Sequence, residues 1–260
     1  MKSEHQHIVG IIPARYGSTR LPAKPLVDLC GKPMIQHVYE RASQASLVDE
    51  IIVATDDDRI VAAVRGFGGN AIMTPADLRS GTDRIALVAK ELRHADIIVN
   101  IQGDEPLIIP AMIDEAVRPL MNDGSIVVGT VVKKIEQSEE IVNPSVVKVV
   151  LDEEHNALYF SRSPIPYLRD NGPVESWHRR HTYFKHFGLY VFRRDFLLKY
   201  AQWKESTLEQ MEKLEQLRIL EHGFNIKATI TEYDSVPVDT ADDAEKVRKI
   251  LKQQLSVRVP

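Results

Sequence analysis

Short apolar runs alternate with segments of helical period along the first half of the chain. Strands are predicted over residues 8–12, 51–53, 71–73, 97–101 and 126–132, where each run is too short for a helix. Helices are predicted between these runs, over residues 33–42, 58–67, 83–92 and about 110–121. Strands that alternate with helices are typical of an α/β fold with a mostly parallel sheet covered on both faces.

The pattern changes in the middle of the chain. Strands are predicted over residues 146–151, 157–161 and 184–192. Polar residues 169–180, which contain the turn-forming Asn171-Gly172-Pro173, predict a surface loop. Helical spacing returns over residues 207–221, for which Gly223 is a suitable stop, and over residues 241–255.

This pattern predicts a single domain over residues 1–260. Its α/β part covers about residues 1–135 and 205–260, and a β-rich lobe is inserted over about residues 140–200. Ligands of parallel sheets bind beyond the carboxyl ends of the strands, so the loops that follow strands are where chemistry is expected.

Composition narrows the function classes. The 33 Lys and Arg residues and 37 Asp and Glu residues give a formal net charge of −4, which disfavours bulk nucleic-acid binding. The single cysteine, Cys30, excludes an intrachain disulfide and fits a reducing cytoplasm. Residues 1–7 lack the apolar core of a signal peptide, and the apolar run at 126–132 is far too short to span a bilayer. We therefore expect a cytoplasmic protein with no membrane insertion and no nucleic-acid partner.

The loop after the first strand carries a cluster of cations. Arg15, Arg20 and Lys24 fall within a short stretch that also contains the small pair Gly17-Ser18 and is stiffened by prolines. Small residues let backbone N–H groups approach phosphate oxygens, and fixed cations offset their charge, so this loop suits a triphosphate. A solvated basic loop is the alternative. The loop does not have the residue order of a Walker A motif. It also lacks the Gly-x-Gly-x-x-Gly turn of dinucleotide-binding proteins, which disfavours hydride transfer.

Two aspartates occupy positions, expected at strand ends, where a metal-bound triphosphate could be held. Asp104 lies in Gln102-Gly103-Asp104-Glu105-Pro106, directly after the strand at 97–101, and Asp239 precedes the last helix. Mg²⁺ takes one or two protein carboxylates and fills its shell with phosphate oxygens and water, so this pair suits it. Asp239 could instead cap the helix, unless Thr240 caps it. Glu105 is expected to face solvent or to act as a cap.

Two further polar segments precede predicted helices. Asp56-Asp57-Asp58 satisfies the Asp-x-Asp pattern of metal-dependent glycosyltransferases, but acids are common in the first turn of a helix, and we favour that interpretation. Residues 80–84 read Ser-Gly-Thr-Asp-Arg. Thr82 is a natural N-cap there, and Gly81 allows close approach to a flat ring.

Seven motifs, in order along nearly the whole chain, resemble those of the 3-deoxy-manno-octulosonate cytidylyltransferases, or CMP-Kdo synthetases. They are residues 13–26, 80–84, 102–106, 160–162, 186–190, 214–218 and 238–240. The resemblance implies a Rossmann-like nucleotide-diphospho-sugar transferase fold whose inserted lobe serves the sugar acid and dimerisation. It also implies transfer of CMP from CTP to the anomeric hydroxyl of Kdo, which releases pyrophosphate and activates Kdo for lipopolysaccharide synthesis, in a homodimer that uses Mg²⁺.

The resemblance also implies roles for individual residues. Contacts to CTP are implied for Arg15, Ser18, Arg20, Lys24, Ser80, Gly81, Thr82, Arg84 and Gln102. Contacts to the sugar acid are implied for Gln102, Arg162, His186, Tyr190, Glu215 and Asp239. The metal ligands would be Asp104 and Asp239, and the catalytic set would be Arg15, Lys24, Asp104 and Asp239.

The residues of the sugar-acid set also admit structural roles. Arg162 suits two-point capture of a carboxylate. His186 and Tyr190 share one face of a strand and could be ordinary half-buried residues. The role of Glu215 could be limited to pairing with Arg218, three residues further along the same helix. No side chain stands out as a general base, and His186 is the nearest candidate.

Several functions therefore compete. An amino-Kdo or another 2-keto sugar acid could replace Kdo as the acceptor. A metal-dependent glycosyltransferase of related fold would use residues 56–58, and a non-catalytic module would bind the nucleotide without turnover. The aromatic residues of the middle segment could form a self-association surface or an internal core; they are Tyr159, Phe160, Tyr183, Phe184 and Phe187.

Overall fold

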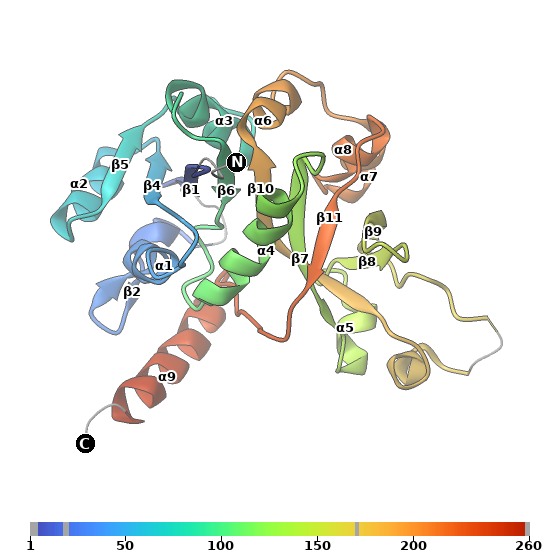
Figure 1. Ribbon diagram of the computed structural model, residues 1–260. Helices are drawn as coiled ribbons and strands as arrows, with labels where there is room; N and C mark the ends of the chain where they lie inside the picture. Colours follow the sequence, from blue (N-terminus) through green and yellow to red (C-terminus); the bar gives the residue numbers. More distant parts are fainter. Residues whose placement is uncertain (1–4, 18–20, 170–171, 258–260) are drawn as a thin grey trace. The chain divides into compact units, whose positions relative to one another are not determined.

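The computed structural model describes residues 5–17, 21–169 and 172–257 (Figure 1). The chain forms two compact units: unit 1 comprises Met1–Asp114 and Asp234–Pro260, and unit 2 comprises Glu115–Tyr233. Unit 1 thus ends earlier and resumes later than the α/β part predicted at about 1–135 and 205–260. The reason is that strands near residues 130 and 230 pair with each other within unit 2.

Unit 1 is built on four parallel strands. They are β1 (Ile8–Ala14), β4 (Glu50–Thr55), β5 (Asn70–Met73) and β6 (Ile97–Asn100). Their order is β6-β1-β4-β5, so that Val9 faces Glu50 on one side and Ile98 on the other. The residues of β6 are all buried and those of β1 nearly so, as continuous apolar runs require in a covered parallel sheet. The predicted mostly parallel α/β fold is confirmed.

Helices connect these strands, and in Figure 1 α1 and α3 lie to either side of them. The helices of unit 1 are α1 (Met34–Ala42), α2 (Asp58–Gly66), α3 (Gly81–Glu91) and α9 (Ala241–Val257). A 3-10 turn, η1 (Lys24–Leu26), leads into a small hairpin of β2 (Asp28–Leu29) and β3 (Lys32–Pro33). Val247 and Leu251 of α9 pack against Leu29 and Met34, so the last helix is held next to the segment that follows the first loop.

Unit 2 has a mixed sheet. Its strands lie in the order β11 (Lys227–Ile230), β7 (Val128–Lys134), β10 (Phe184–Arg193), β8 (Lys148–Leu151) and β9 (Ala157–Ser161), with β11 at one edge. Strand β11 runs parallel to β7, and the other pairs are antiparallel. Its helical segments are α5 (Ser138–Val142), η2 (Val174–Arg179), α6 (Arg194–Tyr200), α7 (Thr207–Glu212) and α8 (Leu217–Glu221).

Helix α4 (Pro110–Asn122) crosses the boundary between the units in sequence. Its unit 2 part packs closely on β7, because a Cβ on Gly129 would lie 2.8 Å from Leu120 Cδ1 and 3.1 Å from the carbonyl oxygen of Ala116. Glycine is the residue that leaves room for this close approach.

Three local predictions are wrong in detail. The helix predicted over 207–221 is two helices, because Lys213 takes a left-handed conformation (φ 54°) that ends α7. The loop predicted over 169–180 contains η2, whose Trp177 is buried against Ile135, Ile141 and Tyr183. The N-cap of α3 is Ser80, which accepts a hydrogen bond from the Asp83 N–H, and Thr82 lies buried inside the helix.

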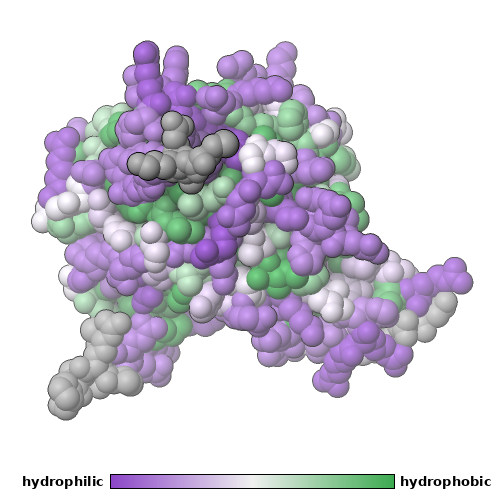
Figure 2. All heavy atoms as spheres, in the orientation of Figure 1, coloured by the Kyte–Doolittle hydropathy of each residue, from purple (hydrophilic) through white to green (hydrophobic). Residues whose placement is uncertain are grey.

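Hydrophilic side chains cover much of the face shown in Figure 2. Two of the predicted surface-or-core aromatics, Phe160 and Tyr183, belong to the core. Among the described residues, no helix combines the length and the apolar character needed to cross a membrane.

A buried ion pair joins α7 to α8. The Arg218 guanidinium donates to both carboxylate oxygens of Glu209, at 2.7 and 2.5 Å, and both side chains are less than a tenth exposed. Arg218→Met should lower the free energy of unfolding by about 3–5 kcal/mol, because it leaves Glu209 buried without its partner. Chemical denaturation measures this loss. Lys32→Met breaks an exposed pair with Glu40 and should cost less than about 1 kcal/mol. Equal losses in the two variants would contradict this explanation.

Candidate active site

Three charged side chains from distant parts of unit 1 meet at one point. The Lys24 ammonium donates to Asp104 Oδ2 at 2.7 Å and to Asp239 Oδ1 at 2.8 Å. Lys24 comes from η1, Asp104 follows β6, and Asp239 precedes α9. The two predicted metal ligands and the predicted phosphate-binding lysine therefore lie within one cluster.

The start of α9 is capped by Thr240 and Asp243. Thr240 Oγ1 accepts a hydrogen bond from the Asp243 N–H, and Asp243 Oδ2 accepts from the N–H of Thr240 in return. This reciprocal pair satisfies the first turn of the helix, so Thr240 and not Asp239 is the cap. The N–H of Val238 also donates to the Asp104 carbonyl at 2.9 Å, which holds the two aspartate segments side by side.

The charges of the cluster are strongly coupled. Burial by itself would lower the pKa of Lys24, but the charges and hydrogen bonds of Asp104 and Asp239 outweigh it and raise this pKa above its ordinary value. The Lys24 side chain is 13% exposed, whereas the side chains of Asp104 and Asp239 are 31% and 36% exposed. The cluster therefore carries one positive charge between two negative ones, and its acidic side is open to solvent.

These residues fit a magnesium ion. Both carboxylates already direct an oxygen at a single cation, the Lys24 ammonium, and carboxylate oxygens are the ligands that Mg²⁺ prefers. Two protein carboxylates leave the remaining positions for phosphate oxygens and water. Magnesium itself stays a prediction for this chain.

Backbone packing places Asp104. A Cβ on Gly103 would lie 2.8 Å from the carbonyl oxygen of Pro13, so glycine is required by the closeness of β1 and not only by a ligand. Glu105 is not turned to solvent as predicted: its carboxylate accepts a hydrogen bond from the Ser235 hydroxyl. Burial raises the pKa of Glu105 to about 7, although that hydrogen bond opposes the rise.

Segments on the other side of the first loop form a second polar group. Arg84 is fully buried and its guanidinium donates to Asp56 Oδ2 at 2.9 Å and to the Thr74 hydroxyl. Arg15 donates to the Leu78 carbonyl at 2.6 Å, which ties the first loop to the segment before α3. Ser80 begins this helix. Ser18 and Arg20 lie outside the described residues.

The three consecutive aspartates are accounted for without a metal. Asp56 pairs with Arg84, and Asp57 caps α2 by accepting a hydrogen bond from the Arg59 N–H at 2.9 Å. Asp58 begins α2. This is the arrangement expected of acids at a helix N-terminus, and it argues against the glycosyltransferase interpretation of residues 56–58.

The predicted sugar-acid residues are divided between the units. Gln102 and Asp239 belong to unit 1, where the Gln102 amide donates to Asn100 at 3.2 Å. In unit 2, the rings of His186 and Tyr190 lie 5.2 Å apart between centroids, which is much closer than the roughly 13 Å between residues four apart on a regular strand. The pairing of β10 with β7 shifts register between these two residues.

The proton of His186 can be located. Thr130 donates its single hydroxyl proton to the Leu189 carbonyl at 2.7 Å, so its 2.9 Å contact with His186 Nε2 requires the histidine to be the donor. Desolvation lowers the pKa of His186 to about 3. The neutral ring therefore carries its proton on Nε2 and a lone pair on Nδ1. Burial also raises the pKa of Tyr190, so this phenol stays protonated.

Arg162 and Glu215 have structural contacts in unit 2. The Arg162 guanidinium donates to the carbonyl oxygens of Glu212, Pro144 and Lys213 at 2.8, 3.0 and 3.4 Å. The Glu215 carbonyl accepts from the Tyr200 hydroxyl. Arg218 pairs with Glu209 across two helices, and the charge of Glu215 also helps to raise the pKa of Arg218. The sugar-acid roles of Arg162 and Glu215 remain predictions.

A family model described as "Cytidylyltransferase" matches residues 9–255. The chain belongs to the cytidylyltransferase family. A relative from Geotalea uraniireducens named 3-deoxy-manno-octulosonate cytidylyltransferase is 55% identical over 255 residues, which cover 95% of this chain and 99% of the relative. One of the same name from Geobacter sulfurreducens is 54% identical over 250 residues and is covered completely, with 95% of this chain aligned.

Solved structures agree with this assignment. The cytidylyltransferase superimposes with a TM-score of 0.89 on CMP:2-keto-3-deoxy-manno-octonic acid synthetase complexed with CTP, at 48% identity, covering 96% of this chain and 100% of that one. A 4-diphosphocytidyl-2C-methyl-D-erythritol synthase from Anaerococcus prevotii has a TM-score of 0.64 at 14% identity over 96% and 98% of the two chains, which supports the fold alone. The resemblance inferred from the motifs is confirmed.

Sequence reasoning missed several residues that organise this cytidylyltransferase. The capping role of Asp243 could have been found, because Thr240 and Asp243 have the spacing of a capping box. Asp56 directly follows β4, the strand next to β1, and pairs with Arg84, whereas the sequence pattern predicts only a role at the start of the next helix. No sequence signal indicates Thr130 as the partner of His186, because their contact depends on strand pairing across 56 residues.

The neutral His186 predicts a pH dependence of stability. Its pKa is about 3 in the fold and about 6.5 in the unfolded chain, so below pH 6.5 the unfolded state binds the extra proton. This contribution to stability is complete above pH 6.5 and is lost progressively as the pH falls toward 3. The difference in unfolding free energy between wild type and His186→Gln should therefore shrink over this range. His181→Gln, at an exposed position, is the control. A difference independent of pH would contradict the assignment.

Proposed function

We propose that this cytidylyltransferase transfers CMP from CTP to the anomeric hydroxyl of 3-deoxy-D-manno-octulosonate, giving CMP-Kdo and pyrophosphate. The observation that carries the proposal is the meeting of Lys24, Asp104 and Asp239 in a chain more than half identical to curated Kdo cytidylyltransferases. The similar structure complexed with CTP supports the choice of nucleotide. CMP-Kdo would supply activated Kdo for lipopolysaccharide synthesis.

The reaction is a displacement at phosphorus. An oxygen–phosphorus bond forms between the sugar hydroxyl and the α-phosphorus of CTP. The bond from the α-phosphorus to the β-phosphate oxygen breaks, its electron pair leaves on pyrophosphate, and the hydroxyl proton passes to water. Little covalent chemistry is required of the protein, so positioning and charge neutralisation supply the rate. A magnesium ion held by Asp104 and Asp239 would polarise the α-phosphate when bound.

Lys24 has a double task in this proposal. Before the nucleotide binds, its ammonium neutralises the repulsion between Asp104 and Asp239 and so keeps both carboxylates directed at one point. When the triphosphate enters, Lys24 can turn from the carboxylates to the phosphate oxygens. Arg15 would steady the same phosphates from the first loop, whose position is set by its bond to Leu78.

Recognition of the nucleotide and the sugar acid would use the remaining predicted residues. Arg84, although buried, fixes Thr74 and Asp56 and thereby supports the segment that carries Ser80, Gly81 and Thr82. In unit 2, the Nδ1 lone pair of His186 is a suitable acceptor for a sugar hydroxyl, since Nε2 already donates to Thr130.

The location and assembly of the protein are part of the proposal. One cysteine and the family resemblance support a cytoplasmic enzyme that acts as a homodimer. Exposed apolar side chains of unit 2 that are suited to self-association are Leu158, Tyr167 and Met211.

Pyrophosphate release from each of four nucleoside triphosphates, with Kdo, an amino-Kdo and a sialic acid as acceptors, tests the function. We expect release with CTP and Kdo in the presence of Mg²⁺, and CMP-Kdo as the product. Preference for the amino sugar would redirect the substrate but keep the reaction class. Nucleotide binding without turnover of any acceptor would overturn the proposal.

Asp104→Asn tests the site. Turnover should fall by at least about 100-fold in this variant. The cation would lose one of its two carboxylate ligands, and Lys24 would lose one of its two charged partners. Far-ultraviolet circular dichroism should be unchanged, since Asp104 is a partly exposed loop residue. Asp195→Asn removes the same charge at a position 95% exposed and should be fully active. Normal turnover of Asp104→Asn would remove Asp104 from the mechanism.

A further inference from the structure

A second group of potential ligands lies at the amino ends of the strands in unit 1. His5 and His7 precede β1, Asp49 precedes β4, and His94 precedes β6. Because these strands are parallel and adjacent, the residues before them meet at the amino ends of the strands. The Lys24 cluster lies beyond the carboxyl ends, so the two groups are separated by the length of the sheet.

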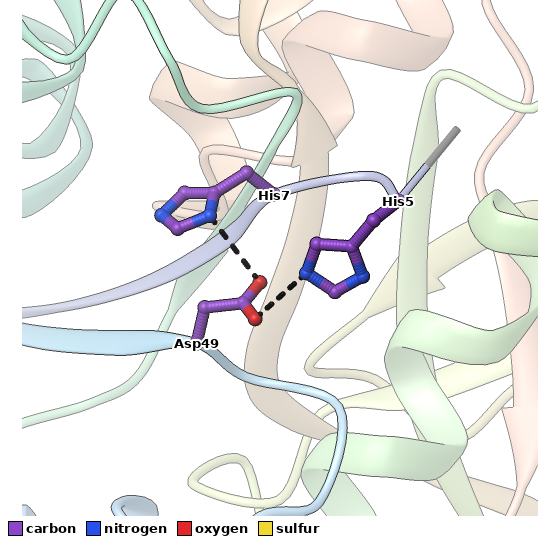
Figure 3. A group of neighbouring side chains, drawn as sticks. All are labelled: His5, His7 and Asp49. Carbon is purple, nitrogen blue, oxygen red and sulfur yellow. Dashed lines mark hydrogen bonds and ion pairs between the residues drawn. The ribbon is translucent and has the colours of Figure 1, made fainter.

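Three of these side chains point toward one another in Figure 3. His5 Nε2 lies 2.9 Å from Asp49 Oδ1, and His7 Nδ1 lies 3.7 Å from Asp49 Oδ2. One ligand atom from each residue lies within 4.8 Å of the other two. Ligand atoms of a tetrahedral zinc ion are roughly 3.3 Å apart, given metal–ligand distances of about 2.0 Å. The trio thus has close to the required spacing before any ion binds.

Backbone hydrogen bonds hold His7 and Asp49 in place, and the His5 side chain is held by its contact with Asp49. The Ile8 N–H donates to Asp49 Oδ2 at 2.8 Å, and the Asp49 N–H donates back to the Ile8 carbonyl at 2.9 Å. On the other side, the His7 N–H donates to Asp96 Oδ2 at 2.8 Å, and the His7 carbonyl accepts from the Asp96 N–H. The segment before β1 is therefore fixed by both neighbouring strands, and Asp49 keeps one oxygen directed at His5. Two of the three ligands, His7 and Asp49, therefore need little reorganisation to bind an ion.

We propose that His5, His7 and Asp49 bind a zinc-class divalent ion, with water in the fourth position. Two imidazoles and one carboxylate are typical ligands of zinc and cobalt, whereas magnesium prefers oxygen alone. The site is therefore chemically distinct from the Asp104 and Asp239 pair. Binding joins the segment before β1 to the start of β4 and stabilises unit 1 by mass action.

A neighbouring trio shares His7. His94 Nε2 lies 3.7 Å from Glu50 Oε2, and the His7 and His94 rings are 4.8 Å apart between centroids. We assign the ion to the first trio because its shortest ligand spacing is smaller and because the N–H of Ile8 orients its carboxylate.

Cobalt is the probe for this assignment. The full chain, in excess Mg²⁺ and without nucleotide, is titrated with Co²⁺ and followed by the visible absorption of tetrahedral cobalt. Zn²⁺ is then added to displace the cobalt. One Co²⁺ per chain is expected, together with a rise in the melting temperature on addition of Zn²⁺. Absence of a tetrahedral spectrum, or of any rise in melting temperature, overturns the proposal.

Single variants locate the ion. His5→Ala and His7→Ala should each weaken Co²⁺ binding by at least about tenfold, because each removes a ligand. His181→Ala removes an exposed histidine of unit 2 and should bind as wild type does. His94→Ala should also keep the site. Since His5 is 74% exposed, its replacement leaves the fold intact. Unchanged binding in His5→Ala, or loss of binding in His94→Ala, overturns the assignment to this trio.

Discussion

The Lys24 ammonium, held between Asp104 and Asp239, is the interaction on which the organisation of unit 1 depends. The three residues come from the first loop, the end of β6 and the start of α9. Without the ammonium, two partly buried carboxylates would lie close together and repel each other. The same geometry suits a cation and a triphosphate. The cation would pair with the two carboxylates, and the triphosphate would pair with the ammonium.

Packing around this cluster explains why it is well placed. The close approach of Gly103 to Pro13 and the hydrogen bond from Val238 to the Asp104 carbonyl set the backbone. The apolar contacts of Val247 and Leu251 hold α9 against the segment that contains Met34. The charged side chains thus stand on segments that are far apart in the sequence but closely packed in the fold. Such packing is required for charge stabilisation without reorganisation.

The amino ends and the carboxyl ends of the strands lie on opposite sides of a parallel sheet, and polar residues gather at both in this chain. Loops after the strands carry the cationic and acidic residues of the proposed active site. Segments before the strands bring histidines and carboxylates together, and there the imidazole nitrogens favour a different class of ion. The separation follows from topology, since parallel strands bring all their starts to one edge and all their ends to the other.

The sequence by itself determined the parallel α/β fold, the family, the positions of Lys24 and Asp104 in loops after strands and that of Asp239 before the last helix, because periodicity and motif order are local properties of the chain. It did not determine which side chains pair with each other. The pairing of Arg84 with Asp56, the burial of Glu105 beside Ser235 and the break of a predicted helix at Lys213 depend on contacts between distant segments or on a single backbone angle. The tertiary structure decided these, because only packing fixes which charges are removed from water and which neighbours then compensate them.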